Sequence, residues 1–312
     1  MKWLRAASWT TVLAVAAYLI VALWLERADL VAALKLISLQ TLVIVLALSL
    51  LNFGLRFLRW HWYLRMLGSS IRPLDNLRIY VGGFALTTTP GSAGELARSV
   101  WLRPYGVPSN WSIAALFAER ILDAIAVALL SCLGLLIYPR GQWLLAASLV
   151  IATLLLILLF SPAAARWVSR WANAHEGRIA ALADRAAHVL SHVRDCLTPT
   201  RAAQGLCLGL LAWSAEGWGF GILLRALGHP LPLAAAISIY ALSKLAGATS
   251  LMPGGLGSAE TTMIVLLKLL GIPLRTAVVA TLLIRLATLW FAELLGLLAL
   301  AIPARSPPDA AP

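Results

Sequence analysis

Seven charged side chains interrupt the apolar stretches of this sequence, and they are the residues best placed to do chemistry. They are Glu119, Arg120, Asp123, Glu216, Lys244, Arg285 and Glu293. An unpaired charge at the centre of a membrane-spanning helix costs about 2.5–3.5 kcal/mol. Seven such costs, roughly 18–25 kcal/mol together, exceed the whole stability of a typical fold. We therefore expect these groups to form ion pairs or to line a wet cavity between helices, where they could hold a charged ligand.

Two Pro-Gly elements could bind an anion. Residues 87–95 read TTTPGSAGE, and residues 250–260 read SLMPGGLGSAE. Proline breaks a helix, glycine permits a close turn, and the helix that restarts near Ser92 or Ser258 exposes free N–H groups that favour a phosphate. The alternative is a kinked helix or an interfacial loop without a ligand. The backbone residues predicted to form the two hairpins are Pro90, Gly91, Gly94, Pro253, Gly254, Gly255 and Gly257.

The elements that position these residues recur in the same order along the chain. The run LRMLG at positions 64–68 recurs as LRALG at positions 224–228. Pro90-Gly91 recurs as Pro253-Gly254, and Arg120 recurs as Arg285. The nearly constant offset between the copies indicates an internal duplication. Chance reuse of Gly-Pro turns, the alternative explanation, does not account for it.

The duplication predicts matched ion pairs, Glu95 with Arg120 and Glu260 with Arg285. One interpretation is structural: each pair locks a hairpin to a helix. The other is that the arginine holds a phosphate while a carboxylate meets a cationic head group. The sequence alone leaves both interpretations open.

Further charged residues extend this candidate site. Glu119 and Asp123 share one face of a helix. Lys244 could attract a phosphate or pair with Glu216 or Glu293. The residues predicted to bind substrate are Glu95, Glu119, Arg120, Asp123, Lys244, Glu260 and Arg285.

The composition places these residues in an integral membrane protein. Of the 312 residues, 61% are hydrophobic and 12% are charged, and the mean hydropathy is +0.87. A soluble domain carries about 25% charged residues. The composition excludes a water-soluble enzyme, a disordered protein and a disulfide scaffold. The net charge of +12 comes mostly from cations that flank apolar stretches, which is typical of membrane topology signals rather than of nucleic-acid binding.

The sequence predicts an all-α polytopic membrane protein with about 7–8 transmembrane segments, two re-entrant hairpins and two inverted-topology repeats. Eight apolar segments support this fold: 6–25, 41–58, 77–89, 112–137, 143–161, 203–224, 233–251 and 274–302. We divide the chain into an N-terminal helix and loop (1–40), a first repeat (41–140), a helix with an amphipathic connector (141–202), a second repeat (203–302) and a tail (303–312).

Charge distribution predicts the orientation. With the N-terminus in the cytoplasm and each hairpin returning to its own side, sixteen Lys and Arg residues lie inside and six outside. The inside set counts Arg56, Arg59 and Arg98 as loop cations. Residues 6–25 are interpreted as a retained first span and not as a signal peptide. We expect a multi-pass protein of the bacterial inner membrane.

The amphipathic connector offers one candidate metal site. His188 and His192 are spaced at i and i+4, with Asp184 and Asp195 nearby. The alternative, a solvated face of an interfacial helix, is the interpretation that we adopt. We predict no metal site, no cofactor and no catalytic residue.

Several motifs together resemble those of the lysylphosphatidylglycerol synthase transmembrane family, also called flippase-like proteins. The motifs are Arg59-Trp60, residues 90–98 (PGSAGELAR), residues 119–123 (ERILD), residues 253–260 (PGGLGSAE) and residues 271–273 (GIP) followed by Arg285. The resemblance covers about residues 40–300. It implies a multi-helix bundle with re-entrant elements that moves a modified phospholipid between leaflets.

The resemblance has one limit. Larger relatives carry an aminoacyl-transfer domain after the membrane part, whereas this chain ends ten residues after its last predicted span. Lipid aminoacylation is therefore not carried over, and we expect no enzyme activity.

The predicted function is transport of a polar or modified phospholipid or glycolipid between leaflets. One alternative is a non-transporting partner of a lipid or glycan biosynthesis enzyme, and another is an intramembrane enzyme that acts on a lipid. The expected partners are membrane lipids and such a synthesis enzyme, with no nucleic acid. The sequence does not predict an oligomeric state or which lipid is moved.

Overall fold

The computed structural model describes residues 37–89, 94–136, 188–250 and 252–302, and the regular structure of these residues is helical. The prediction of an all-helical fold is confirmed for this part of the chain. The expected first span at 6–25, the apolar segment 143–161, and Pro90 and Gly91 of the first hairpin lie outside the described residues.

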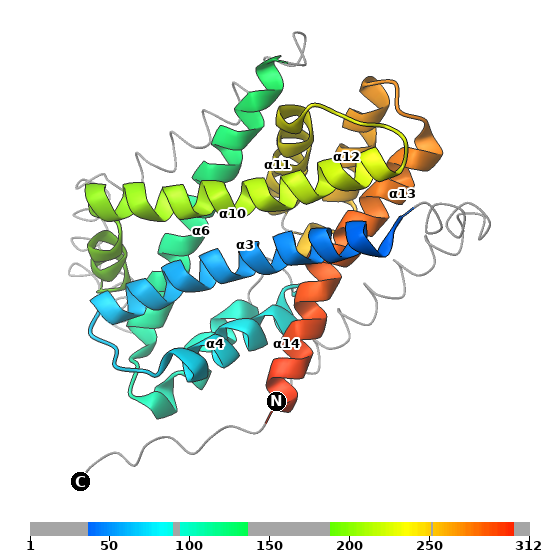
Figure 1. Ribbon diagram of the computed structural model, residues 1–312. Helices are drawn as coiled ribbons and strands as arrows, with labels where there is room; N and C mark the ends of the chain where they lie inside the picture. The colour runs from blue at the N-terminus through cyan, green and yellow to red at the C-terminus, as the bar shows by residue number, and fades with distance from the viewer. Residues whose placement is uncertain (1–36, 90–93, 137–187, 251, 303–312) are drawn as a thin grey trace.

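Two long helices lie side by side and run antiparallel (Figure 1). They are α3, Leu39–Met66, and α10, Pro199–Ala226, and each contains 28 residues. Both helices end in the same way. The backbone N–H of Ser69 donates to the carbonyl of Leu64, and that of His229 donates to the carbonyl of Leu224, at 2.9 Å in each case. Helix α10 thus begins and ends at the positions that correspond, in the sequence repeat, to the two ends of α3.

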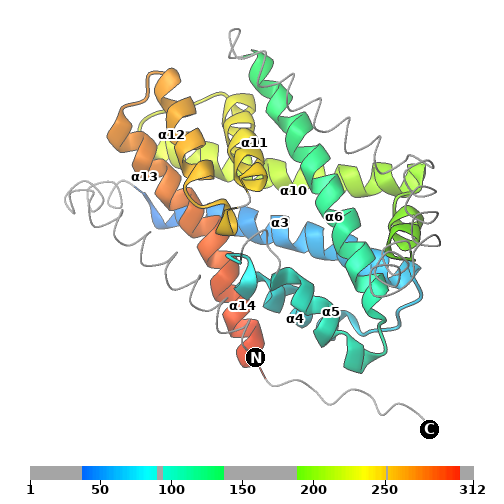
Figure 2. The same ribbon diagram turned by 180° about the vertical axis from the view of Figure 1, so that it is seen from behind.

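Two further long helices cross this pair in opposite directions (Figure 2). The first is α6, Ser109–Ser131. The second is continuous from Leu274 to Ala301 and is made of α13, Leu274–Arg285, a π-helical turn, Leu286–Trp290, and α14, Phe291–Ala301.

Shorter helices fill the spaces between the long ones. Their bounds are Pro73–Gly82 for α4, Ala97–Trp101 for α5, Leu233–Thr249 for α11 and Ser258–Leu269 for α12. Proline is the first residue of one short helix and of one long one, because a proline at the first helical position removes only an N–H that has no partner within the helix. Pro73 begins α4 and Pro199 begins α10 in this way. A 3₁₀ turn, Gly83–Leu86, extends α4, and α14 packs against both.

Three of the described helices are long and apolar enough to cross a membrane: Leu39–Met66, Pro199–Ala226 and Leu274–Ala301. Large apolar side chains remain exposed on their outer surfaces, as contact with lipid tails requires. Examples are Leu50, Leu51, Leu211, Leu297 and Leu298. The apolar helix α11 has 17 residues.

The buried apolar residues form two clusters. One gathers Tyr240, Phe220 and Leu267 between α10, α11, α12 and α13. The other gathers Trp60, Tyr80 and residues of α6 between α3, α4 and α6. We call α3 to α6 the first half and α10 to α14 the second half, and the candidate site lies where they meet.

Candidate binding site between the two halves

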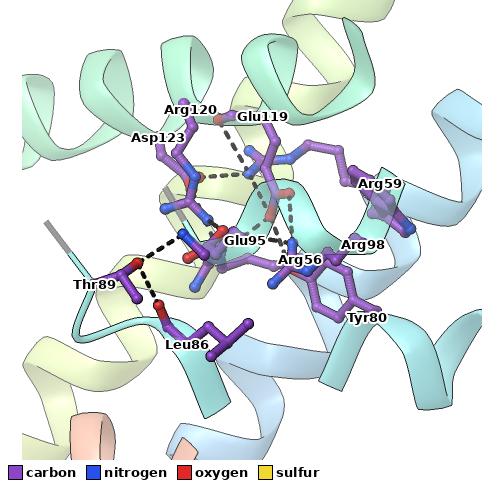
Figure 3. Close-up of polar contacts among 12 residues, drawn as sticks. Arg56, Arg59, Tyr80, Leu86, Thr89, Glu95, Arg98, Glu119, Arg120 and Asp123 are labelled. Carbon is purple, nitrogen blue, oxygen red and sulfur yellow. Dashed lines mark hydrogen bonds and ion pairs between the residues drawn. The ribbon is translucent and has the colours of Figure 1, made fainter. Parts of the chain in front are cut away.

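The first predicted ion pair is present. The Arg120 guanidinium donates to the Glu95 carboxylate at 2.6 Å (Figure 3). Arg98, on α5, approaches the same carboxylate at 3.6 Å. The Glu95 side chain is 3% exposed, whereas that of Arg120 is 36% exposed. The carboxylate is therefore buried behind an arginine that remains available to a ligand.

The second predicted ion pair is also present and is built differently. Arg285 donates to the Glu260 carboxylate at 2.6 Å and to the carbonyl of Gly254 at 2.8 Å. The other oxygen of Glu260 accepts the N–H of Gly257 at 2.7 Å. These bonds tie the turn Pro253–Gly255 to α12 and α13. Gly254, Gly255 and Gly257 all have positive φ values, as the predicted backbone turn requires.

The start of α12 shows which group accepts the N–H of its N-cap residue. Helix α12 begins at Ser258 as predicted, but Gly257 is the N-cap and Glu260 accepts its N–H. A carboxylate of the chain itself thus accepts one of the N–H groups that the sequence offered to a phosphate.

The described ends of the first hairpin are held together by Thr89. Its hydroxyl donates to the carbonyl of Leu86 and accepts the N–H of Gly94, both at 2.7 Å (Figure 3). A Cβ atom at Gly94 would lie 2.4 Å from the Cβ of Leu86, so only glycine fits there.

Glu119 and Asp123 face two arginines of α3. Arg59 donates to Asp123 at 2.5 Å, and Arg56 lies 3.4 Å from Glu119 and 3.5 Å from Asp123. The hydroxyl of Tyr80 donates to Glu119 at 2.7 Å. The two carboxylates thus lie on one face of α6, as predicted, and their partners come from α3 and α4. Arg120 points instead toward Glu95.

These contacts correct the predicted charge count. Arg56, Arg59 and Arg98 were counted as loop cations on the inside, but all three are buried within the helices. They balance buried carboxylates and so contribute nothing to the inside-positive bias. Arg98 lies over the rings of Tyr80, at 4.2 Å, and Phe84, at 5.4 Å.

A cavity of about 420 Å³ opens between the two halves. Charged side chains from both halves line it: Arg56, Glu95, Arg120, Asp123, Glu216, Lys244 and Arg285. The turn residues Gly254 and Gly255 form part of the wall, and an apolar side is supplied by Phe53, Phe84, Val127, Leu245, Leu289 and Ala292. Five of the predicted site residues lie behind the wall and do not line the cavity themselves: Glu119, Glu260, Gly94, Pro253 and Gly257.

Lys244 contacts aromatic rings and not a carboxylate. Its ammonium lies 4.8 Å from the ring centre of Trp213 and 5.9 Å from that of Tyr240. No carboxylate of the described residues forms an ion pair with it. The hydroxyl of Tyr240 donates to Glu216 at 2.6 Å, and the hydroxyl of Thr88 donates to Glu293 at 2.5 Å. Of the two alternatives predicted for Lys244, the ion pair with Glu216 or Glu293 is therefore not formed.

The two Pro-Gly elements approach each other beside Glu293. Thr88 belongs to the first element, and a Cβ atom at Gly254 in the second would lie 3.2 Å from its methyl group. Glu293 of α14 holds the same threonine. The first element is therefore fastened to a helix of the second half.

The sequence profile of the lysylphosphatidylglycerol synthase TM region matches residues 11–296. This chain belongs to that family. Three curated relatives, each called UPF0104 membrane protein, come from Methanothermobacter thermautotrophicus. One is 24% identical over 83% of this chain and 84% of its own length, and another is 24% identical over 87% and 86%. The third matches at 34% over 28% of this chain. Family membership and the apolar helices make the protein a multi-pass membrane protein.

Several of the motifs that carry the family resemblance contribute residues to the cavity lining, namely Glu95, Arg120, Asp123, Gly254, Gly255 and Arg285. Sequence reasoning still missed several lining residues, among them Arg56, Trp213 and Thr288. Arg56 had a signal, because Glu119 and Asp123 required two cations and α3 offers Arg56 and Arg59 one helical turn apart. A single tryptophan in an apolar helix, such as Trp213, carries no comparable signal.

Proposed function

We propose that this protein moves a polar phospholipid or glycolipid between the leaflets of a membrane, with the cavity between the halves as the head-group site. The observation that carries the proposal is the lining of that cavity. Four cations and three carboxylates from both halves meet beside an apolar wall. Charged groups among membrane-spanning helices typically mark a substrate path. A lipid presents the matching combination of a charged head group and apolar chains.

The arrangement of the helices supports an alternating-access mechanism. Corresponding long helices run antiparallel, as α3 does to α10 and α6 to α13–α14 (Figures 1 and 2). Two repeats of inverted topology related in this way, with the substrate between them, are common in secondary transporters. In the proposed topology the N-terminus is cytoplasmic, the Pro-Gly elements are re-entrant, and the membrane is a bacterial inner membrane.

The roles of the site residues follow from their exposure. Arg120 presents the more exposed guanidinium and contacts the head group, while Glu95 keeps it in place. Arg285 is 3% exposed and maintains the second turn beside the ligand. We assign no catalytic role to these residues.

The test is leaflet-to-leaflet movement of fluorescent phospholipids in liposomes that contain the purified protein. Arg120→Gln, Glu260→Gln and Arg285→Gln are compared with Lys268→Gln, whose side chain is exposed on α12 away from the cavity. Folding of each variant is checked first by size exclusion and thermal unfolding. We expect the wild type and Lys268→Gln to move lipid and Arg120→Gln to lose most of that activity. Equal movement by folded Arg120→Gln contradicts the proposed site.

The second candidate is a non-transporting partner of a lipid or glycan biosynthesis enzyme. It is favoured by the structural use of Arg285, which fastens a turn and is almost fully buried. It predicts that every charge-neutralising change lowers protein accumulation, and that the purified wild type moves no lipid with any head group.

A further inference from the structure

One indole ring in the cavity wall has two cations beside it. The Arg56 guanidinium carbon lies 5.2 Å from the ring centre of Trp213, and the Lys244 ammonium lies 4.8 Å from it. The two positive groups therefore share one aromatic neighbour and lie in the same corner of the cavity. They come from α3 and α11, and Trp213 comes from α10. All three residues line the cavity.

The lining of the cavity contains donors without a hydrogen-bond partner. The indole N–H of Trp213 and the hydroxyl of Thr87 are buried and make no hydrogen bond within the described residues. The Nε of Arg56 makes none either, but it lies within ion-pair distance of Glu119 and Asp123, at 3.4 and 3.5 Å. Buried polar groups are nearly always paired, so groups without a partner call for an explanation. The unmatched groups also include the Arg120 Nε and one acceptor, the Asp123 Oδ2. Donors thus outnumber acceptors on this wall.

The carboxylates of the lining are already engaged by other groups. Arg120 forms an ion pair with Glu95, and the hydroxyl of Tyr240 donates a hydrogen bond to Glu216. Asp123 accepts from Arg59 and lies 3.5 Å from Arg56. Lys244 is the lining cation that forms no ion pair with a carboxylate of the described residues. An anion from outside the chain would relieve the repulsion between Lys244 and Arg56 and would accept from the indole N–H.

We propose that Lys244, Arg56 and the indole N–H of Trp213 form a binding site for the phosphodiester of an anionic lipid, one whose head group carries no cation and whose net charge is therefore −1. The inference rests on the proposed function, because it names the substrate class of that cavity. A phosphodiester has two unesterified oxygens, which suit two cationic donors and one N–H that share the same indole ring. Phe53 and Leu245 of the same wall face the apolar part of an amphiphile. Inorganic phosphate shares the anionic chemistry but lacks the apolar part.

Direct binding to the detergent-purified full chain tests this site without requiring transport. The probes are dioctanoyl phosphatidylglycerol, whose glycerol head group leaves the phosphate as its single charge, dioctanoyl phosphatidylcholine, and inorganic phosphate. We expect phosphatidylglycerol to bind more tightly than either of the others. Lys244→Gln weakens its binding about tenfold or more, because a charge-assisted contact is lost. Lys244→Arg keeps the affinity within about threefold, since the charge remains.

Two controls keep the test decisive. Lys268→Gln removes an exposed lysine from α12 and leaves binding unchanged. Trp213→Phe keeps an aromatic ring beside the cations but removes the indole N–H, so it weakens phosphatidylglycerol binding even if Lys244→Gln fails to fold. Unchanged affinity in Lys244→Gln, or in Trp213→Phe when Lys244→Gln is unfolded, overturns the site. Equal binding of phosphatidylcholine, or preferred binding of inorganic phosphate, overturns the substrate class.

The proposed function and this binding site can each fail without the other, and the two experiments distinguish the cases. If Lys244→Gln binds phosphatidylglycerol normally while the wild type still moves lipid and Arg120→Gln does not, the transport proposal survives and this site is wrong. If the wild type moves no lipid but binds phosphatidylglycerol through Lys244, the site survives and the transport proposal fails.

Discussion

The side chain of Asn52 donates a hydrogen bond to the backbone carbonyl of Ala212 at 2.9 Å. These two residues occupy corresponding positions of the repeat, because the same sequence offset relates the bounds of α3 to those of α10. Contact at corresponding positions of two antiparallel helices is what an approximate twofold axis through the contact would produce, as the proposed inverted repeat requires.

Replacing Asn52 is expected to weaken the contact between α3 of the first half and α10 of the second half. The side chain is completely buried, so Asn52→Ala removes one hydrogen bond and leaves a small space. We expect a loss of about 1–2 kcal/mol, seen as a drop of several degrees in the apparent Tm in detergent. Leu51→Ala, at a half-exposed neighbouring position, is the control and changes Tm little. Equal shifts for the two variants contradict the role given to Asn52.

The antiparallel pair predicts opposite membrane sides for two corresponding loops. Ser70 follows α3, Pro230 follows α10, and both residues are exposed. In a chain whose native cysteines are replaced, we expect only Ser70→Cys to react with a membrane-impermeant maleimide added to the cytoplasmic side. Only Pro230→Cys reacts from the other side. Labelling of both residues from one side contradicts the inverted topology.

Close packing of α14 on the turn that follows α4 depends on Gly296. A Cβ atom there would lie 2.3 Å from the backbone nitrogen of Ala85, which cannot move aside as a flexible side chain could. Gly296→Ala is expected to destabilise the protein by about 1–3 kcal/mol or more. Gly54→Ala is the matched control, because nothing lies within 4 Å of its added Cβ. Thermal unfolding that ranks the two variants in the opposite order rejects this packing.

The two ion pairs should differ in their effect on stability. Arg285→Gln removes an ion pair and the bond to the carbonyl of Gly254, both almost fully buried. Breaking a buried pair costs about 3–5 kcal/mol. Arg120 is partly exposed, and Arg98 remains 3.6 Å from Glu95 after Arg120→Gln, so the loss is smaller. Thermal unfolding should give Arg285→Gln the lower Tm, and lipid movement should be impaired in Arg120→Gln although its Tm falls less.

The sequence was sufficient to predict the helical fold and the matched ion pairs. A duplicated sequence repeats its contacts, so the offset that joins Arg120 to Arg285 also identified Glu95 and Glu260 as partners. The burial of the Arg59 side chain against Asp123 could not be predicted in the same way. Its partner Asp123 lies far along the chain on another helix, and a neighbouring Trp-His-Trp-Tyr run suggested a membrane interface.

Local spacing also could not determine which group would satisfy each carboxylate. Lys244 lies on the same helix as Tyr240, one turn later, and both could reach Glu216. The tyrosine hydroxyl makes that bond, and the ammonium lies over an indole ring instead. Only the three-dimensional packing of α10 against α11 decides between them.

Arg56 and Glu216 occupy corresponding positions of the two copies and carry opposite charges. A dimer of two identical half-chains would place two arginines or two glutamates at these positions, with like charges facing the same cavity. Joining both halves in one gene removes that restriction, because each copy can then acquire its own mutations. The fused chain can therefore evolve a polar, asymmetric site on a nearly symmetric scaffold.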